Sequence, residues 1–166
     1  MSDSPSLARA KNVALRYLAA RARSEAQVRD RLRRAELGLE ADAAVAWLVG
    51  LGYLDDVAYA RSRARALVAA GRLGPRLAER RLLAAGIERG RAREAVAEAL
   101  AAAAGGGAGE AEATLCRALA EKRAGRAGVA ALDDRARRRL ARFLLGRGFS
   151  PDAVAGTLGL RDDAAA

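Results

Sequence analysis

The 166-residue sequence contains no histidine and only one cysteine, Cys116. The absence of histidine excludes Ser-His-Asp and Cys-His catalytic arrangements. It also excludes a metal site built from cysteine and histidine. A single cysteine cannot form a disulfide within the chain, which favours a reducing compartment. We therefore expect a cytoplasmic protein that is not an enzyme, with no catalytic residue, no metal ligand and no cofactor.

Residues typical of β-strands are also scarce. Aromatic residues make up 4% of the chain and Ile87 is the only isoleucine, although 52% of all residues are hydrophobic. Most of these are Ala, Leu and Val, in the periodic arrangement of helices and not in alternating strand runs. No charge-free apolar run is long enough to suggest a membrane span. The composition predicts an all-α fold with no membrane association.

Anionic residues are fewer than cationic ones, with 20 Asp and Glu against 30 Lys and Arg, so the net charge is +10 at pH 7. All cations except Lys11 and Lys122 are arginines. The surplus is +1 over residues 1–57, +6 over residues 58–104 and +3 over the remainder. A basic protein is attracted to polyanions, so nucleic acid is the first expected partner.

Three glycine-centred segments indicate an internal repeat. Gly38 to Leu48 and Gly148 to Leu158 have equal spacing, while the segment from Gly86 to Leu100 is longer by four residues, about one helical turn. We expect each glycine to end a helix in the left-handed conformation, with the next residue covering the helix end. Those covering residues would be Leu39, Ile87 and Phe149. The pattern predicts three tandem three-helix, helix-turn-helix-like repeats.

The predicted boundaries follow from these signals and from the glycine-rich stretch after residue 104. We expect a disordered leader over residues 1–10, unit one over 11–57, unit two over 58–104, a Gly/Ala linker over 105–109, unit three over 110–160 and a tail over 161–166. Ser24 and Gln27 form a predicted capping box, and Pro75 is expected in the first turn of a helix.

Acidic pairs occur at Asp55-Asp56 and Asp133-Asp134. Both precede predicted helices, where a carboxylate accepts hydrogen bonds from free backbone N–H groups. A divalent metal site needs more converging oxygens than either pair supplies, so capping is the favoured interpretation. The run Gly105-Gly106-Gly107 lacks the Gly-Lys-Ser/Thr that follows in a phosphate-binding loop, which favours a linker.

Arginines at helical spacing are the candidate contacts to a partner or to DNA. Arg61 and Arg65 lie one turn apart, as do Arg76 and Arg80, and Arg72 lies between the two pairs. A second set forms a basic ridge opposite the apolar residues of its predicted helix. It consists of Arg135, Arg138, Arg139 and Arg142. The alternative is a solvated face that only confers solubility.

Aromatic residues offer a weaker signal for nucleic-acid binding. Trp47, Tyr53 and Tyr59 could stack on bases, but they fall at predicted core-facing or inter-helix positions, so packing is favoured. Cys116, beside Leu115 and Leu119, is expected to be a small buried hydrophobic residue.

At several ordered motifs the sequence resembles the RecX family, bacterial regulators of the RecA recombinase. The motifs are Arg21-x-Arg23-Ser24-Glu25, then Gly52-Tyr53-Leu54-Asp55-Asp56, then Leu82-x-x-x-Gly86-Ile87 and Arg147-Gly148-Phe149. The structural signature residues are Arg21, Arg23, Ser24, Gly52, Tyr53, Asp55, Asp56, Gly86, Gly148 and Phe149. The departures are the four-residue insertion after Ile87 and the long Ala/Gly segment.

The resemblance implies an elongated, curved array of three-helix repeats that binds in the groove of a RecA–DNA filament. It implies inhibition of the recombinase, ATPase and coprotease activities of RecA, and so a role in DNA repair, homologous recombination and the SOS response. The expected partners are RecA and single- and double-stranded DNA without sequence specificity, bound by a monomer. The alternatives are an independent helical DNA-binding module and a helical scaffold for other proteins.

Overall fold

The computed structural model describes residues 4–104 and 107–160, and over these residues the chain is helical, with no strand. Unit one contains α1 (Pro5–Ala20), α2 (Glu25–Arg33) and α3 (Ala41–Gly50). Unit two contains α4 (Asp56–Ala69), α5 (Pro75–Ala84) and α6 (Arg89–Ala104). Unit three contains α7 (Ala108–Ala124), a short 3-10 turn (Gly125–Ala127), α8 (Asp134–Gly146) and α9 (Pro151–Leu158). The predicted all-α fold of three-helix repeats is confirmed.

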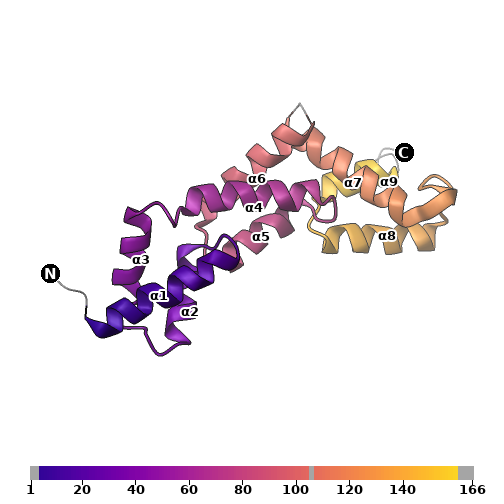
Figure 1. Cartoon of the computed structure of the whole chain (residues 1–166). Helices are drawn as coiled ribbons and strands as arrows, with labels where there is room; N and C mark the ends of the chain where they lie inside the picture. The colour runs from indigo at the N-terminus through magenta and orange to yellow at the C-terminus, as the bar shows by residue number, and fades with distance from the viewer. Residues whose placement is uncertain (1–3, 105–106, 161–166) are drawn as a thin grey trace.

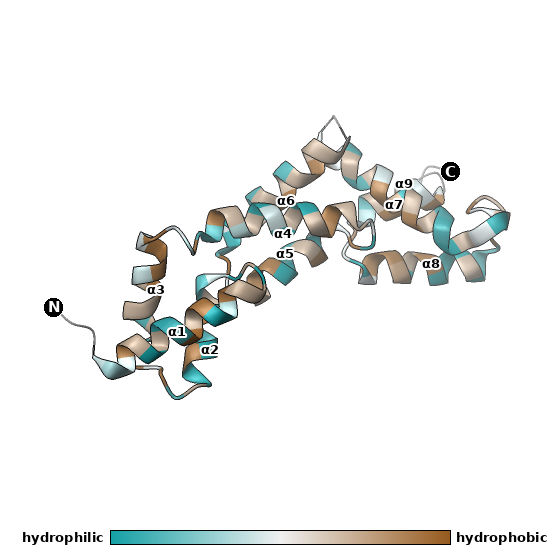
Figure 2. Ribbon diagram, viewed as in Figure 1, coloured by the Kyte–Doolittle hydropathy of each residue, from teal (hydrophilic) through white to brown (hydrophobic). Residues whose placement is uncertain are grey.

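The units follow one another along an elongated molecule, and α6 and α7 meet at an angle where unit two passes to unit three (Figure 1). The buried apolar residues fall into three clusters. Val28, Leu32 and Leu48 are central in the first, Leu82 and Val96 in the second. Leu144 and Phe149 are central in the third. In Figure 2 the helices show both hydrophobic and hydrophilic residues along their length. This mixture is expected of amphipathic helices, which bury one face and expose the other.

The middle helix of each unit ends in the same backbone motif. Glu36, Gly86 and Gly148 have φ values of 60°, 82° and 88° and follow the ends of α2, α5 and α8. The next residue then donates its N–H to a carbonyl five residues earlier. These bonds join Leu37 to Leu32 (2.9 Å), Ile87 to Leu82 (3.1 Å) and Phe149 to Leu144 (3.3 Å). In each motif the donating residue is buried.

The expected role of Gly38 and Leu39 in this motif is wrong. Leu39 is 99% exposed, whereas Leu37 is 5% exposed and covers the end of α2. The left-handed residue in unit one is Glu36, so no glycine marks the turn in the sequence. The glycine signal therefore pointed two residues beyond the left-handed residue, Glu36.

Unit one meets unit two at what we call the first joint, formed by Ser24, Ala26, Ala85 and Gly86. Ser24 is fully buried at the start of α2 and donates its hydroxyl hydrogen to the carbonyl oxygen of Ala85 at the end of α5. A Cβ on Gly86 would overlap the Ala26 methyl group. The joint therefore requires close approach of the end of α5 to the first turn of α2.

Unit two meets unit three at the second joint, which repeats this arrangement one unit further along. The N–H of Gly74 donates to the carbonyl of Arg147 at 2.8 Å, and the N–H of Arg76 donates to that of Gly148 at 3.1 Å. A Cβ on Gly148 would overlap the backbone and side chain of Leu77. The end of α8 is thus set against the start of α5, and α2, α5 and α8 follow one another along one side of the molecule (Figure 1).

Three predicted boundaries need correction. Residues 5–10 are helical and not a disordered leader, because Ser4 caps α1 and Pro5 occupies its first turn. Ala108 and Gly109, expected in the linker, belong to α7, while residues 105–106 lie outside the described residues. The expected division between residues 57 and 58 cuts the first turn of α4, which begins after Asp55. The predicted tail also lies outside the described residues.

Within the described residues, no helix is both long enough and apolar enough to cross a membrane.

Candidate partner and nucleic-acid surface

Several signature residues cap helices or hold the first joint. Asp55 Oδ1 accepts the N–H groups of Val57 and Ala58 at 2.8 and 3.0 Å, which caps α4. Asp56 Oδ1 instead accepts the N–H of Glu25 at 2.9 Å, at the start of α2. Burial raises the pKa of the Asp56 carboxyl, although the hydrogen bond from Glu25 opposes that effect. Asp55 therefore caps α4, and Asp56, in the first turn of α4, connects this helix to the start of α2.

The turn after α3 contains the signature residues Gly52 and Tyr53. Gly52 has a φ of 73°, and Tyr53 donates its N–H to the carbonyl of Leu48 at 2.9 Å. The expectation that Tyr53 packs at a core-facing or inter-helix position is wrong, because the residue is 61% exposed and the next residue, Leu54, is buried instead. Tyr59 and Trp47, by contrast, pack against the cores of units two and one.

The arginines predicted in unit two are exposed, but they are not equivalent. Arg61 is paired with Glu98 of α6, its Nε lying 3.0 Å from one carboxylate oxygen. Arg65 lies beside the same glutamate in a shallow hollow. Arg76 and Arg80 are exposed on α5, and Arg72 lies in the turn before it. The pairing of Arg61 leaves Arg65, Arg72, Arg76 and Arg80 as the better candidates for external anions.

The predicted ridge on α8 has the expected geometry. Leu140 and Leu144 are buried and Phe143 is half-buried. The four arginines of the opposite side are exposed, and none of them forms an ion pair within the described residues. They are Arg135, Arg138, Arg139 and Arg142. Asp133 caps the helix by accepting the N–H of Ala136 at 2.7 Å.

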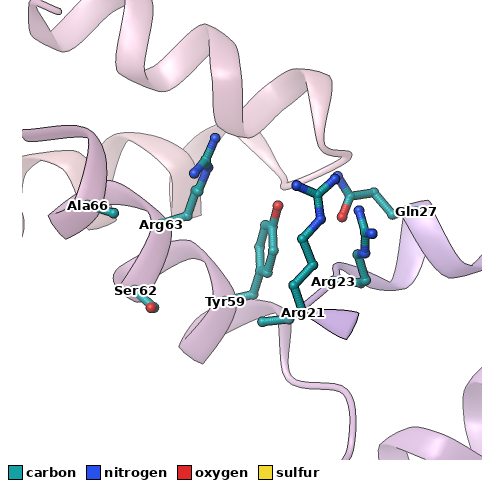
Figure 3. Close-up of a pocket in the computed structure, with 8 residues that line it drawn as sticks. Arg21, Arg23, Gln27, Tyr59, Ser62, Arg63 and Ala66 are labelled. Atoms are coloured by element: carbon teal, nitrogen blue, oxygen red, sulfur yellow. The ribbon is translucent and has the colours of Figure 1, made fainter. Parts of the chain in front are cut away.

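A hollow of about 270 Å³ lies between units one and two, and we call it the first hollow (Figure 3). Three of its lining residues are cationic and none is acidic. It is lined by Arg21, Ala22, Arg23, Gln27, Tyr59, Ser62, Arg63 and Ala66. The guanidinium of Arg23 also lies over the ring of Tyr17, 4.0 Å from its centroid. Two signature arginines thus face a concave surface beside the first joint.

A second hollow of about 350 Å³ lies between units two and three. It is again free of acidic residues, with Gly71, Arg72, Leu119, Lys122, Arg123, Phe143 and Arg147 as its lining. The guanidinium carbons of Arg123 and Arg147 lie 5.2 and 5.0 Å from the centroid of the Phe143 ring. Each boundary between neighbouring units therefore has a concave, cationic surface that includes an aromatic residue, Tyr59 in the first hollow and Phe143 in the second.

Four cations of these hollows were not predicted from the sequence as contacts to a partner or to DNA: Arg63, Lys122, Arg123 and Arg147, the last of which was named only as part of a family motif. Each hollow draws on residues from two units that are far apart in the sequence, so helical spacing within one segment could not group them. The motif Arg21-x-Arg23 was singled out only as a signature. The position of this motif directly before a predicted helix was the one sequence signal that could have indicated a role for Arg21 and Arg23 in binding. No group of three or more metal-ligating side chains lies together in residues 4–104 and 107–160.

Comparison with known proteins gives consistent matches. The family model for the first three-helix domain of RecX matches residues 10–48, and that for its third three-helix domain matches residues 110–156. No curated protein sequence matched the chain. The crystal structure of RecX from Lactobacillus salivarius is similar at 23% identity and a TM-score of 0.71, covering 95% of this chain and 97% of that one. A second crystal structure, of regulatory protein RecX, has 24% identity and a TM-score of 0.75, covering 94% of this chain and 74% of that one.

Proposed function

Because this chain belongs to the RecX family of regulatory proteins, we propose that it binds RecA and RecA–DNA filaments and mostly inhibits the activities of RecA. The affected activities are the recombinase, ATPase and coprotease functions used in DNA repair. The site that we propose is the groove of the filament, to which the elongated shape of the array of units is suited (Figure 1). The protein acts as a cytoplasmic monomer and performs no chemistry of its own.

The observation that carries this proposal is the alternation of units and cationic hollows along the elongated molecule. The first hollow lies between units one and two, and the second between units two and three. Neither is lined by an acidic residue. A partner that presents anionic groups at intervals complements such a surface. DNA within a protein filament, with phosphates along its length, has that property.

The proposal is tested by measuring ATP hydrolysis by RecA on single-stranded DNA while the protein is titrated in. We expect the rate to fall, and the protein alone to hydrolyse no ATP. A variant with Arg72, Lys122 and Arg123 of the second hollow changed to Ala should inhibit less. The control is Arg16→Ala, Arg93→Ala and Arg117→Ala, which removes the same charge from exposed helix positions outside both hollows.

Two outcomes would overturn the proposal. ATP turnover that persists in the protein after repurification would contradict the absence of enzymatic activity. Equal DNA affinity with and without RecA, together with an unchanged RecA ATPase rate, would favour an independent DNA-binding module. A pull-down on filaments and on bare DNA separates that result from a scaffold, which would bind neither.

A further inference from the structure

The first hollow gathers donors from both sides of the first joint. Arg21 and Arg23 come from the connection between α1 and α2, and Arg63 comes from α4 in unit two. Figure 3 shows the guanidinium groups of Arg21 and Arg63 beside the hydroxyl end of Tyr59, with the amide of Gln27 nearby. All of these groups can donate hydrogen bonds. The hollow is therefore a donor-rich site assembled from two units.

The neighbouring carboxylates are engaged elsewhere. Glu25 pairs with Arg29 at 3.1 Å, Asp55 caps α4, and Asp56 accepts the N–H of Glu25. No carboxylate lines the hollow. Three guanidinium groups without an internal counter-charge repel one another, and an external anion between them removes that repulsion. The positive charge of Arg21, Arg23 and Arg63 is thus left for a bound anion to neutralise.

Arg23 is held in place before any ligand arrives. Its guanidinium lies over the Tyr17 ring, and its Nε is buried without a hydrogen-bond partner. A side chain fixed in this way loses little conformational freedom when it binds. Guanidinium groups match the oxygens of phosphate, to which they donate two parallel hydrogen bonds. A fixed arginine with two others facing the same space is suited to a tetrahedral oxyanion.

We propose that the first hollow binds a phosphate group and that the bound phosphate stabilises the first joint. The phosphate belongs either to the backbone of a nucleic acid or to a free nucleotide. If the phosphate belongs to a nucleic acid, the inference rests on the proposed function; if it belongs to a free nucleotide, it does not. Because Arg63 and the pair Arg21 and Arg23 come from different units, a phosphate held between them binds only the docked arrangement. Ligand binding to that arrangement alone stabilises it by mass action.

The test uses the full chain without RecA. Amide signals of Ala22, Ser62 and Ala66 are followed by NMR during titration with pyrophosphate, with ATP free of magnesium, or with an oligothymidylate. Ionic strength is held constant with sodium chloride. We expect saturable shifts at these amides. The variant Arg21→Ala with Arg63→Ala should weaken binding at least about tenfold. The charge-matched control, Arg16→Ala with Arg93→Ala, should bind as the unmodified protein does.

The source of the phosphate follows from which probe saturates the site. Shifts with the oligothymidylate alone identify a nucleic-acid backbone, and shifts with ATP or pyrophosphate as well identify a site for free phosphates. Absence of saturable shifts with all three probes overturns the proposal. So does equal weakening in the hollow variant and the control, since this would reflect net charge alone. Either failure leaves the ATPase test with RecA unaffected. A melting temperature that rises with probe in the unmodified protein, but not in the hollow variant, tests the stabilised joint.

Discussion

Ser24 in unit one donates its hydroxyl hydrogen to the carbonyl oxygen of Ala85 in unit two, across 61 positions of the sequence. The same hydroxyl oxygen accepts the N–H of Gln27, so a helix cap and a contact between units share one atom. The capping box expected from Ser24 and Gln27 is present. Its second role in the joint has no sequence signal, because the capping box is complete without it.

Ser24→Ala should destabilise the protein by about 1–3 kcal/mol, because it removes a cap and leaves the buried Ala85 carbonyl without this donor. The matched control is Ser4→Ala, which removes the cap of α1 at an exposed position outside both joints. We expect that change to cost about 1 kcal/mol or less. Urea unfolding followed by circular dichroism measures both. Equal losses would mean that the bond to Ala85 contributes nothing.

Gly86→Ala should destabilise the first joint for two separable reasons. An alanine at a φ of 82° is strained by about 1–2 kcal/mol, and its methyl group would also overlap Ala26. Gly52→Ala is the control for the strain, since its φ is 73° and its surroundings are open. In the Gly86→Ala background, Ala26→Gly should recover part of the lost stability. A double-mutant cycle with no coupling between positions 26 and 86 would contradict the close approach.

Asp56→Asn should change the pH dependence of stability. Burial raises the pKa of Asp56 in the folded state, so the folded protein binds its proton more tightly than the unfolded chain does. Stability contributed by this group therefore falls as pH rises from the unfolded pKa, about 3.9, through the raised folded value. Asparagine retains an oxygen for the N–H of Glu25 and carries no charge. The stability of the variant relative to the unmodified protein should rise across that interval, as measured by urea unfolding at several pH values.

The corresponding control is Asp55→Asn. Asp55 caps α4 from an exposed position, so this variant removes a carboxylate from the same helix start without removing a partly buried one. A difference between Asp56→Asn and the unmodified protein that stays constant from acid to neutral pH would contradict the assignment of the shift to burial.

Changing Arg135, Arg138, Arg139 and Arg142 together to Ala should reduce the salt dependence of DNA binding. Each lost phosphate contact flattens the log–log slope by about 0.7 on single strands and about 0.9 on duplex DNA. Folding should persist, since Leu140 and Leu144 keep the buried side of α8 intact. Fluorescence anisotropy at a series of salt concentrations gives the slope. An unchanged slope, with native circular dichroism, would identify these arginines as a solvated face.

Cys116 should react slowly with thiol reagents in the folded protein. Its side chain is fully buried, and burial is the main cause that raises the pKa of its thiol above the usual value. Labelling at neutral pH should therefore require opening of unit three and should accelerate in denaturant. Val154→Ala, which makes a cavity in the same core, should accelerate labelling, whereas Val28→Ala in the core of unit one should not. Rapid labelling of the unmodified protein without denaturant would contradict the burial.

The sequence predicts the helical repeats well where the signal is local. Pro75, Asp133 and Ser24 each lie at the helix starts expected of them. It fails where an unusual backbone conformation is adopted by an ordinary residue, as at Glu36, and the glycine two positions later then attracts a wrong assignment. The exposure of Tyr53 could not be inferred either, since Tyr53 and Leu54 are adjacent and both have large apolar side-chain surfaces, yet only Leu54 is buried.

The candidate site shows the same limit at longer range. The exposed ridge on α8 follows from periodicity within one helix. The pairing of Arg61 with Glu98 joins α4 to α6, and the first hollow joins Arg21 to Arg63. Such contacts depend on how whole units dock. A single sequence carries no periodic signal for them.

The second joint also accounts for an asymmetry in where charged residues lie along α5 and α8. A helix usually places acidic residues in its first turn and basic ones in its last, where they oppose the partial charges of its dipole. Yet α5 has no acidic residue in its first turn and α8 has no basic residue in its last. Because Gly74 and Arg76 donate to the carbonyls of Arg147 and Gly148, which directly follow α8, the negative end of one helix dipole faces the positive end of the next. Acidic residues appear at the free start of α8, in Asp133 and Asp134, and basic ones at the far end of α2, in Arg31 and Arg33. The first joint differs, because Glu25 lies in the first turn of α2 and Arg81 in the last turn of α5. Only the second joint, with its backbone hydrogen bonds between units, lacks both kinds of charged side chain.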